Sequence, residues 1–255
     1  MRRSAFTLIE LLVVIAIIAV LMGILMPSLR LARDHAKRIH CVGNVKTLSL
    51  AWFMYKDAND DDLVPGHTQD NPIQWVGRAE QGMTLEQKKQ KIREGLLYPY
   101  TGKTVDVYRC PADQRDKDPR QDTFRSFSIA GGANGEDWGS YNKARKYSDL
   151  KNPAIRYVFI EEIDPRGGNI GSWQMNPRVS GSTWTDPVAM WHNKKSTIGF
   201  ADGHAEMHAW EDKSFIDWNV KAMYNQGFSF GMTPPAEDFR DIEFMARGFP
   251  YKSLK

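Results

Sequence analysis

The chain has 255 residues, with 34 basic and 31 acidic side chains and a formal net charge of +3. This near balance argues against a nucleic-acid binder, which needs a strongly basic face, and no nucleic acid is expected as a partner. Two cysteines are too few for a small disulfide scaffold and allow one bridge at most.

The first predicted element is an apolar segment from Phe6 to Met26, in which Glu10 is the one charged residue. A helix of this length rises about 31 Å, enough to cross the hydrocarbon core of a membrane. A secretory signal peptide fits poorly, because the segment is too long and no small-x-small cleavage site follows it. A plain membrane anchor needs only about 20 apolar residues, so it stays open as an alternative.

Glu10 is the informative residue of this segment. A charged side chain at the centre of a membrane span costs about 2.5–3.5 kcal/mol, so a buried Glu10 should have a partner. The alternative is that Glu10 lies near the cytoplasmic edge of the membrane and stays hydrated, since five residues of helix cover only about 7.5 Å.

The N-terminus resembles that of type IV pilin-like proteins. Arg2-Arg3-Ser4-Ala5, followed by Phe6-Thr7-Leu8-Ile9-Glu10, is similar to the leader that prepilin peptidase cuts. The resemblance implies cleavage between Ala5 and Phe6, methylation of the new amine of Phe6, and Glu10 as the fifth residue of the mature chain. It also implies that Glu10 pairs with the amine of a neighbouring subunit during assembly. Ala5 stands where the family usually has Gly.

The helical pattern continues beyond Pro27, which should kink or interrupt the helix. Apolar residues recur at three- and four-residue steps. They are Leu29, Ala32, Ala36, Ile39, Val42, Val45 and Leu48. One helix from about residue 6 to about residue 57 is therefore predicted, with its second half against a globular domain. The predicted parts are the leader (1–5), a membrane helix (6–26), an amphipathic continuation (27–57) and the globular domain (58–255).

The orientation in the membrane rests on the resemblance. Basic residues between positions 30 and 38 outnumber those of the leader, which by charge alone would place the globular domain in the cytoplasm. Pilin-like proteins have the opposite orientation, so the domain is expected in the periplasm or at the cell surface, anchored by a single pass through the bacterial inner membrane.

Several shorter elements are predicted in the globular domain. Residues 58–62 form an acidic turn, whose spacing does not match a calcium loop of the EF-hand type. A helix should run from Leu85 to about Leu97, and a buried strand from Tyr157 to Ile160. Residues 165–187 are rich in glycine and proline and indicate a long irregular loop. A short helix is expected within residues 234–247.

The clearest hairpin places Asp202-Gly203 between residues 196–201 and 204–210, which favours a two-residue turn. In that register one face carries apolar side chains, those of Ile198, Phe200, Ala205 and Met207. The opposite face carries possible zinc ligands, those of His204, Glu206 and His208. An ordinary exposed strand face would produce the same pattern.

A second resemblance begins at His192, which precedes Asp202-Gly203 by nine intervening residues. This spacing is similar to the C-terminal H-X9-DG signature of a large bacterial group of pilin-like proteins. Cys41-Val42-Gly43-Asn44, residues 55–59, Cys110-Pro111-Ala112-Asp113 and residues 152–160 agree with the same group. We expect a structural role for the motif, with Asp202 shaping the turn and His192 bonding its carboxylate.

Cys41 and Cys110 are candidates for a disulfide in an exported protein. Their bridge would close a loop of about 70 residues and stabilise the fold by roughly 4 kcal/mol. Two free buried thiols are the alternative.

The expected fold class is α+β, a long N-terminal helix packed on an antiparallel β-sheet. The resemblance implies a structural subunit of a type II secretion pseudopilus or a type IV pilus-like filament, with prepilin peptidase, other subunits and inner-membrane lipid as partners. No catalytic residue, metal or cofactor is expected. A first rival is a membrane-anchored glycan-binding protein that uses Trp173, Trp184 and Trp191. A second is an envelope hydrolase with a metal near His192, Asp202 and Glu161.

Overall fold

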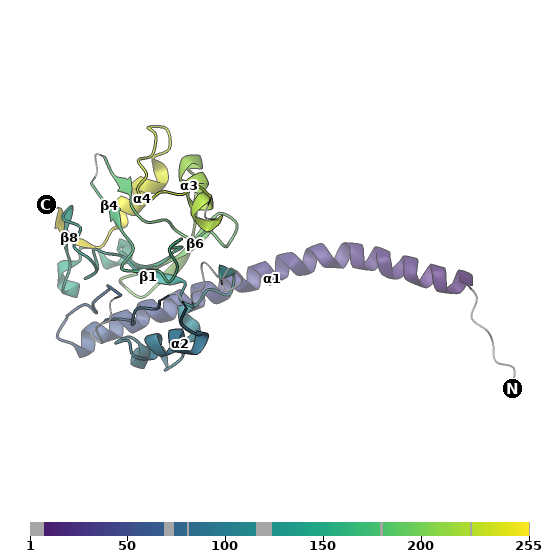
Figure 1. Ribbon diagram of the computed structural model, residues 1–255, viewed down its shortest axis with the longest axis horizontal. Coiled ribbons are helices and arrows are strands. Elements are labelled where there is room, and N and C mark those ends of the chain that lie inside the picture. Colours follow the sequence, from purple (N-terminus) through teal and green to yellow (C-terminus); the bar gives the residue numbers. More distant parts are fainter. Residues whose placement is uncertain are drawn as a thin grey trace.

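A long helix projects from a globular domain that surrounds its C-terminal part (Figure 1). The computed structural model describes residues 8–68, 74–80, 82–115, 124–178, 181–224 and 226–254. The helices are α1 (Leu8–Ala58), α2 (Leu85–Arg93), α3 (Lys213–Tyr224) and α4 (Arg240–Gly248), with 3-10 turns η1 (Tyr98–Thr101), η2 (Asp106–Tyr108), η4 (Tyr147–Asp149) and η5 (Pro153–Ile155). The strands are β1 (Phe127–Ile129), β2 (Tyr141–Lys143), β3 (Tyr157–Glu161), β4 (Met175–Asn176), β5 (Thr183–Trp184), β6 (Lys195–Phe200), β7 (Ala205–Ala209) and β8 (Tyr251–Leu254).

Helix α1 runs without a break through Pro27, so the predicted interruption is wrong and only a gentle curve remains (Figure 1). Proline removes a single backbone donor, and the residues on both sides keep the helical hydrogen bonding. The hydroxyl of Ser28 also donates to the carbonyl of Leu25 at 2.8 Å. The prediction of one continuous helix from about residue 6 to 57 is confirmed over the part of it that the structure describes.

The contact between α1 and the domain begins later than predicted. Leu29 and Ile39, which belong to the predicted apolar stripe, are 58% and 61% exposed. Ala32 and Ala36, which lie between them, offer little apolar area to a partner. The buried face starts at Cys41 and consists of Cys41, Asn44, Val45, Leu48, Ser49, Ala51 and Trp52.

A four-stranded antiparallel sheet of order β1-β3-β6-β7 forms the centre of the domain. Helix α1 crosses one face of the sheet, while α3 and α4 cover the other (Figure 1). Strands β1, β3 and β6 are therefore largely buried on both sides, while the edge strand β7 stays partly exposed. The apolar core is split into two layers. The predicted α+β class, a long helix against an antiparallel sheet, is confirmed.

The β6–β7 hairpin exists, but its turn and register differ from the prediction. Phe200 pairs with His204 through a backbone hydrogen bond of 2.9 Å, so the loop has three residues, with Gly203 at φ 93°. A three-residue loop that ends in a left-handed glycine is a common hairpin turn. This shift of one residue places the side chains of β7 on the opposite faces of the sheet from those predicted. Ile198 lies opposite Glu206, and Thr197 lies opposite Met207.

Other elements differ from the prediction in their extent. Helix α2 ends at Arg93, four residues early, and α4 begins only at Arg240. Helix α3 was not predicted, although its apolar positions now lie in the core. The loop predicted over residues 165–187 contains the two-residue strands β4 and β5. The predicted strand after Arg156 is confirmed and includes Glu161.

Candidate functional site

The N-terminal part of α1 is an exposed apolar surface. Helix α1 contains a window long and apolar enough to cross a membrane, and none of that window is buried. Large apolar side chains from Leu8 to Met26 are 46–84% exposed, which water disfavours strongly. Glu10 lies within this segment and is itself exposed. Ala5 and Phe6, the predicted cleavage pair and methylation site, lie outside the described residues.

A second feature is a buried cluster of four side chains, Cys41, Cys110, Glu161 and His192. Their ligand-type atoms all lie within 4.8 Å of one another. All four side chains are at most 3% exposed. They come from four separate segments: α1, the turn after η2, the end of β3 and the turn before β6.

Local structure explains how these segments meet. Cys41 begins the buried face of α1, one helical turn before Val45. An irregularity in β3 between Tyr157 and Phe159 places Phe159 opposite Gly199, on the face that α1 covers. Glu161 follows two residues later on that same face. His192 lies in a turn completed by Asn193 and Lys194, both in the left-handed backbone region at φ 58° and 57°.

Glu161 is the centre of the cluster. Its Oε1 accepts a hydrogen bond from the Cys41 thiol at 2.8 Å and lies 3.2 Å from Nε2 of His192. The same Nε2 lies 3.2 Å from Sγ of Cys110. The four heteroatoms therefore converge on one small volume between the helix and the sheet.

An outer set of hydrogen bonds holds the cluster. The backbone N–H of Thr197 donates to Oε2 of Glu161 at 2.8 Å, and its hydroxyl donates to Sγ of Cys41 at 3.3 Å. The N–H of Ala112 donates to Sγ of Cys110 at 3.4 Å. These donors all point at lone pairs of the inner groups.

The turn that carries Cys110 is fixed by a buried ionic network. The Cys110 N–H donates to the Ser126 hydroxyl at 3.0 Å, and that hydroxyl donates to Asp113 at 2.6 Å. Arg115 binds both carboxylate oxygens of Asp113 and reaches Asn169 at 2.6 Å. Because these groups are buried and paired, the position of Cys110 is rigidly defined.

The environment changes the pKa values of the cluster. Burial, with Cys110 and Glu161 alongside, raises the pKa of the Cys41 thiol. Burial lowers the pKa of His192, but its contacts with Cys110 and Glu161 outweigh this and raise the pKa to about 10. His192 and Glu161 thus lie 3.2 Å apart as a buried pair, in contact with the sulfurs of Cys110 and Cys41.

The geometry does not suit a nucleophilic cysteine. In a catalytic triad the base uses one ring nitrogen for the nucleophile and the other for the orienting acid. Here Nε2 of His192 makes both contacts, with Cys110 and with Glu161. The side chains are also sealed in the core, where a substrate has no access.

The structure separates the two halves of the H-X9-DG motif. The expected bond between His192 and Asp202 is wrong, because Asp202 instead accepts from the ring of His204 at 2.5 Å and from its backbone N–H at 3.1 Å. The expected turn role of Asp202-Gly203 agrees with the observed loop. The two cysteines do come together, as free thiols, so the disulfide stays a prediction.

The structure does not favour the alternative roles considered for the other sequence candidates. His208 stacks on Phe244, and among the described residues it forms no metal-type group with His204 and Glu206. Trp173 and Trp184 are at most 1% exposed and pack in the core, so they offer no face for a sugar.

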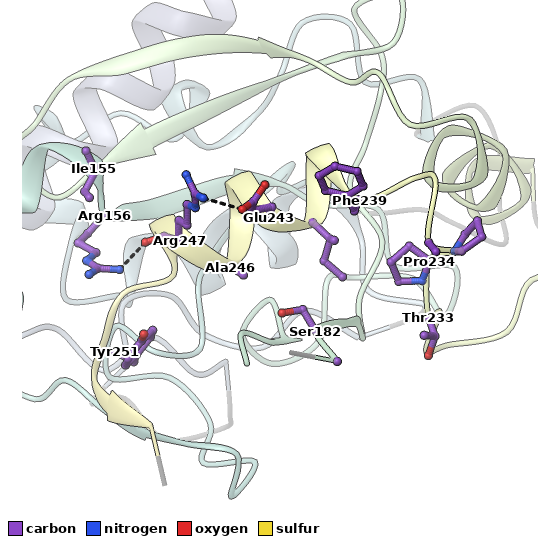
Figure 2. A pocket seen from close by; sticks show the side chains of 14 residues that line it. Ile155, Arg156, Ser182, Thr233, Pro234, Phe239, Glu243, Ala246, Arg247 and Tyr251 are labelled. Carbon is purple, nitrogen blue, oxygen red and sulfur yellow. Dashed lines mark hydrogen bonds and ion pairs between the residues drawn. The ribbon is translucent and has the colours of Figure 1, made fainter. Parts of the chain in front are cut away.

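A groove of about 620 Å³ lies beside α4, and Figure 2 shows the side chains that line it. Among them Arg247 pairs with Glu243 at 2.6 Å, and Arg156 donates to the Arg247 carbonyl at 2.6 Å. The apolar lining residues include Ile155, Pro234, Phe239, Ile242 and Ala246. Within the described chain, no group of metal-type ligands lines this groove.

The sequence contained only partial signals for the buried cluster. The sequence pairs Cys41 with Cys110 as a candidate disulfide and places His192 in a motif with Asp202. Glu161 was noted only within a hydrolase alternative, although a carboxylate that continues an apolar strand such as Tyr157–Ile160 is unusual. Nothing in a linear sequence links four positions that lie up to 151 residues apart, as Cys41 and His192 do.

Comparison with known proteins agrees with the N-terminal features. The family model described as "Prokaryotic N-terminal methylation motif" matches residues 1–26. No curated protein and no solved structure matches the chain. The chain therefore carries a prepilin-type methylation motif at the start of a long apolar helix.

Proposed function

We propose that this protein is a pilin-like structural subunit of a type II secretion pseudopilus or a type IV pilus-like filament. One observation supports the proposal above the others: the helix from Leu8 to Met26 is apolar and wholly uncovered, and it coincides with the methylation motif. An uncovered apolar surface of this size needs lipid or other copies of the same helix around it.

The proposed processing and assembly of the subunit follow from this arrangement. Prepilin peptidase cuts between Ala5 and Phe6 and the new amine is methylated, while the helix holds the subunit in the inner membrane. The globular domain then lies on the outer side. During assembly the N-terminal helices pack side by side in the filament, and Glu10 of one subunit pairs with the amine of another.

The role proposed here is structural and not catalytic. The metal-dependent hydrolase alternative needed His192 and Asp202 around one centre, and these residues bond to different partners. The glycan-binding alternative is weakened because Trp173 and Trp184 are buried. A membrane-anchored subunit that never polymerises is the remaining rival, and assembly assays distinguish it.

The intact mass of the membrane-extracted protein tests processing. In cells with prepilin peptidase we expect a chain that begins at Phe6 and carries one extra methyl group on its amine. In cells without the peptidase we expect the full-length, unmethylated chain. A full-length chain in both strains would contradict the proposal and leave a plain anchor.

A further inference from the structure

The buried cluster has the composition of a metal centre. It offers two sulfurs, one imidazole nitrogen and one carboxylate oxygen, from Cys41, Cys110, His192 and Glu161. Mixed thiolate and imidazole sets of four are characteristic of tetrahedral zinc. Calcium and magnesium prefer sites made of oxygen ligands, which this cluster does not provide.

We propose that Cys41, Cys110, Glu161 and His192 bind one Zn²⁺ ion, which ties helix α1 to the central sheet.

The spacing of the four side chains fits such an ion. Ligand atoms around tetrahedral zinc are separated by about 3.3–3.8 Å, from metal–ligand bonds of about 2.0–2.3 Å. The observed separations are 2.8 Å between Sγ of Cys41 and Oε1 of Glu161, and 3.2 Å from Nε2 of His192 to Oε1 of Glu161 and to Sγ of Cys110. The remaining pairs stay within 4.8 Å. Movements of about 1 Å or less in the side chains would complete the coordination shell.

The outer hydrogen bonds are those that a zinc site requires. Ligands of a metal are commonly held by second hydrogen bonds, which fix their orientation. Thr197 bonds both Cys41 and Glu161, and the N–H of Ala112 bonds the sulfur of Cys110 from two residues further along the chain. An N–H donor to sulfur stabilises a thiolate, which is the form that binds metal.

The site would be structural. Four protein ligands fill a tetrahedral shell and leave no open position for water or substrate. Zinc binds thiolates and a neutral imidazole, so binding would release the protons of both thiols to solvent. The ion would also cross-link α1, β3 and the turns before β6 and after η2, four segments that are distant in sequence.

A disulfide between Cys41 and Cys110 is the competing state of the same residues. It would require the two sulfurs to move to about 2.05 Å from each other. Glu161 and His192 would then remain as a buried pair with no role in the bridge. Zinc and disulfide exclude each other, which makes the proposal testable.

The metal content of the full-length protein is the decisive measurement. The protein is extracted in detergent and purified with a reductant, without chelators or a metal-affinity tag. Elemental mass spectrometry should find one zinc ion per chain. Cys110→Ser and His192→Ala should each lose the zinc, while the control His204→Ala, which changes a half-buried histidine of the β6–β7 hairpin outside the cluster, should keep it.

A second measurement needs no variant and so does not depend on variant folding. Wild-type protein is stripped of metal under reducing conditions and loaded with Co²⁺. Thiolate-to-cobalt charge-transfer bands, together with the strong visible absorption of a tetrahedral ion, are expected, and Zn²⁺ should abolish both.

Two outcomes would overturn the proposal. One is a reduced wild-type protein that holds no zinc and takes up neither Zn²⁺ nor Co²⁺ at neutral pH, with both thiols reacting with an alkylating agent. The other concerns protein that is extracted without reductant. In it, the two thiols react with the alkylating agent only after reduction, and the reduced protein again binds neither Zn²⁺ nor Co²⁺. The second outcome would establish the disulfide in place of the metal.

Discussion

Glu136 is a partly buried carboxylate that joins three loops of the domain. Its Oε1 lies 2.6 Å from Nε2 of His67, and its Oε2 accepts from the N–H of Ser172 at 3.2 Å. Burial opposes ionisation of Glu136, but the bonds to His67 and Ser172 outweigh it and lower its pKa. The ionised carboxylate therefore stabilises the fold.

We predict a pH-dependent loss of stability when Glu136 is replaced by Gln. Because folding lowers the pKa of Glu136, its contribution is present above its unfolded pKa of about 4.3 and is lost as the pH falls through the lower folded value. At pH 7 the free energy of unfolding of the Glu136→Gln variant should be about 1–2 kcal/mol lower than that of the wild type. In denaturation experiments this difference between variant and wild type should disappear toward pH 3. A gap that stayed constant with pH would show that the carboxylate charge has no part in it.

At the scale of elements, the contact between α1 and β6 depends on a glycine. A Cβ atom on Gly199 would overlap the Ser49 hydroxyl and lie 2.6 Å from Cγ1 of Val45. Both of these side chains are on the buried face of α1. The helix can therefore approach the strand only where the strand has no side chain.

We predict opposite effects for two glycine substitutions at this interface. Gly199→Ala should lower the free energy of unfolding by about 1–3 kcal/mol, because the interior is overpacked. Gly43→Ala adds its methyl group on the outer side of α1, with nothing within 4 Å. It should be neutral or stabilising by up to about 1 kcal/mol, because alanine favours helix. Equal destabilisation by both substitutions in denaturant titrations would argue against the close approach of α1 to β6.

At the scale of the whole molecule, the protein consists of a covered domain and an uncovered helix. Between Leu8 and Ala36 no residue of α1 is buried, and the apolar part ends at Met26. About 50 Å of helix therefore extends away from the domain before its first buried residue, Cys41. This division separates the surface that folds the subunit from the surface proposed to assemble it.

Because of this division, we predict that Glu10→Ala leaves folding and membrane insertion intact but abolishes assembly. The helix stays apolar without Glu10, while the partner of the Phe6 amine is lost. Cross-linking of subunits in membranes, with sheared filaments as a second assay, measures assembly. Asp34→Ala is the matched control, since it removes a carboxylate of α1 outside the apolar segment. Normal assembly of the Glu10→Ala variant would refute the proposed pairing.

The long helix, the strand at residues 157–160, the β6–β7 hairpin and the fold class were all predictable, because each depends on a local pattern. Composition alone marks Phe6–Met26 as a membrane segment, and the motif around Glu10 is read from contiguous residues. Helix α3 was not predicted, because its apolar positions can be recognised as a buried face only when they pack against the sheet. The prediction assigned the side chains of β7 to the wrong faces, because one extra residue in the loop shifts every cross-strand pair between β6 and β7 by one position.

The sequence by itself determined the long apolar helix and its methylation motif, since both are recognised from contiguous residues without a tertiary partner. Only the tertiary structure decided which residues surround His192. Sequence spacing linked His192 to Asp202, yet the turn carries Asp202 to the surface and the buried faces of α1 and β3 bring Cys41 and Glu161 to His192. Contacts between distant segments are set by how helix and sheet pack together, and that packing is a property of the whole fold.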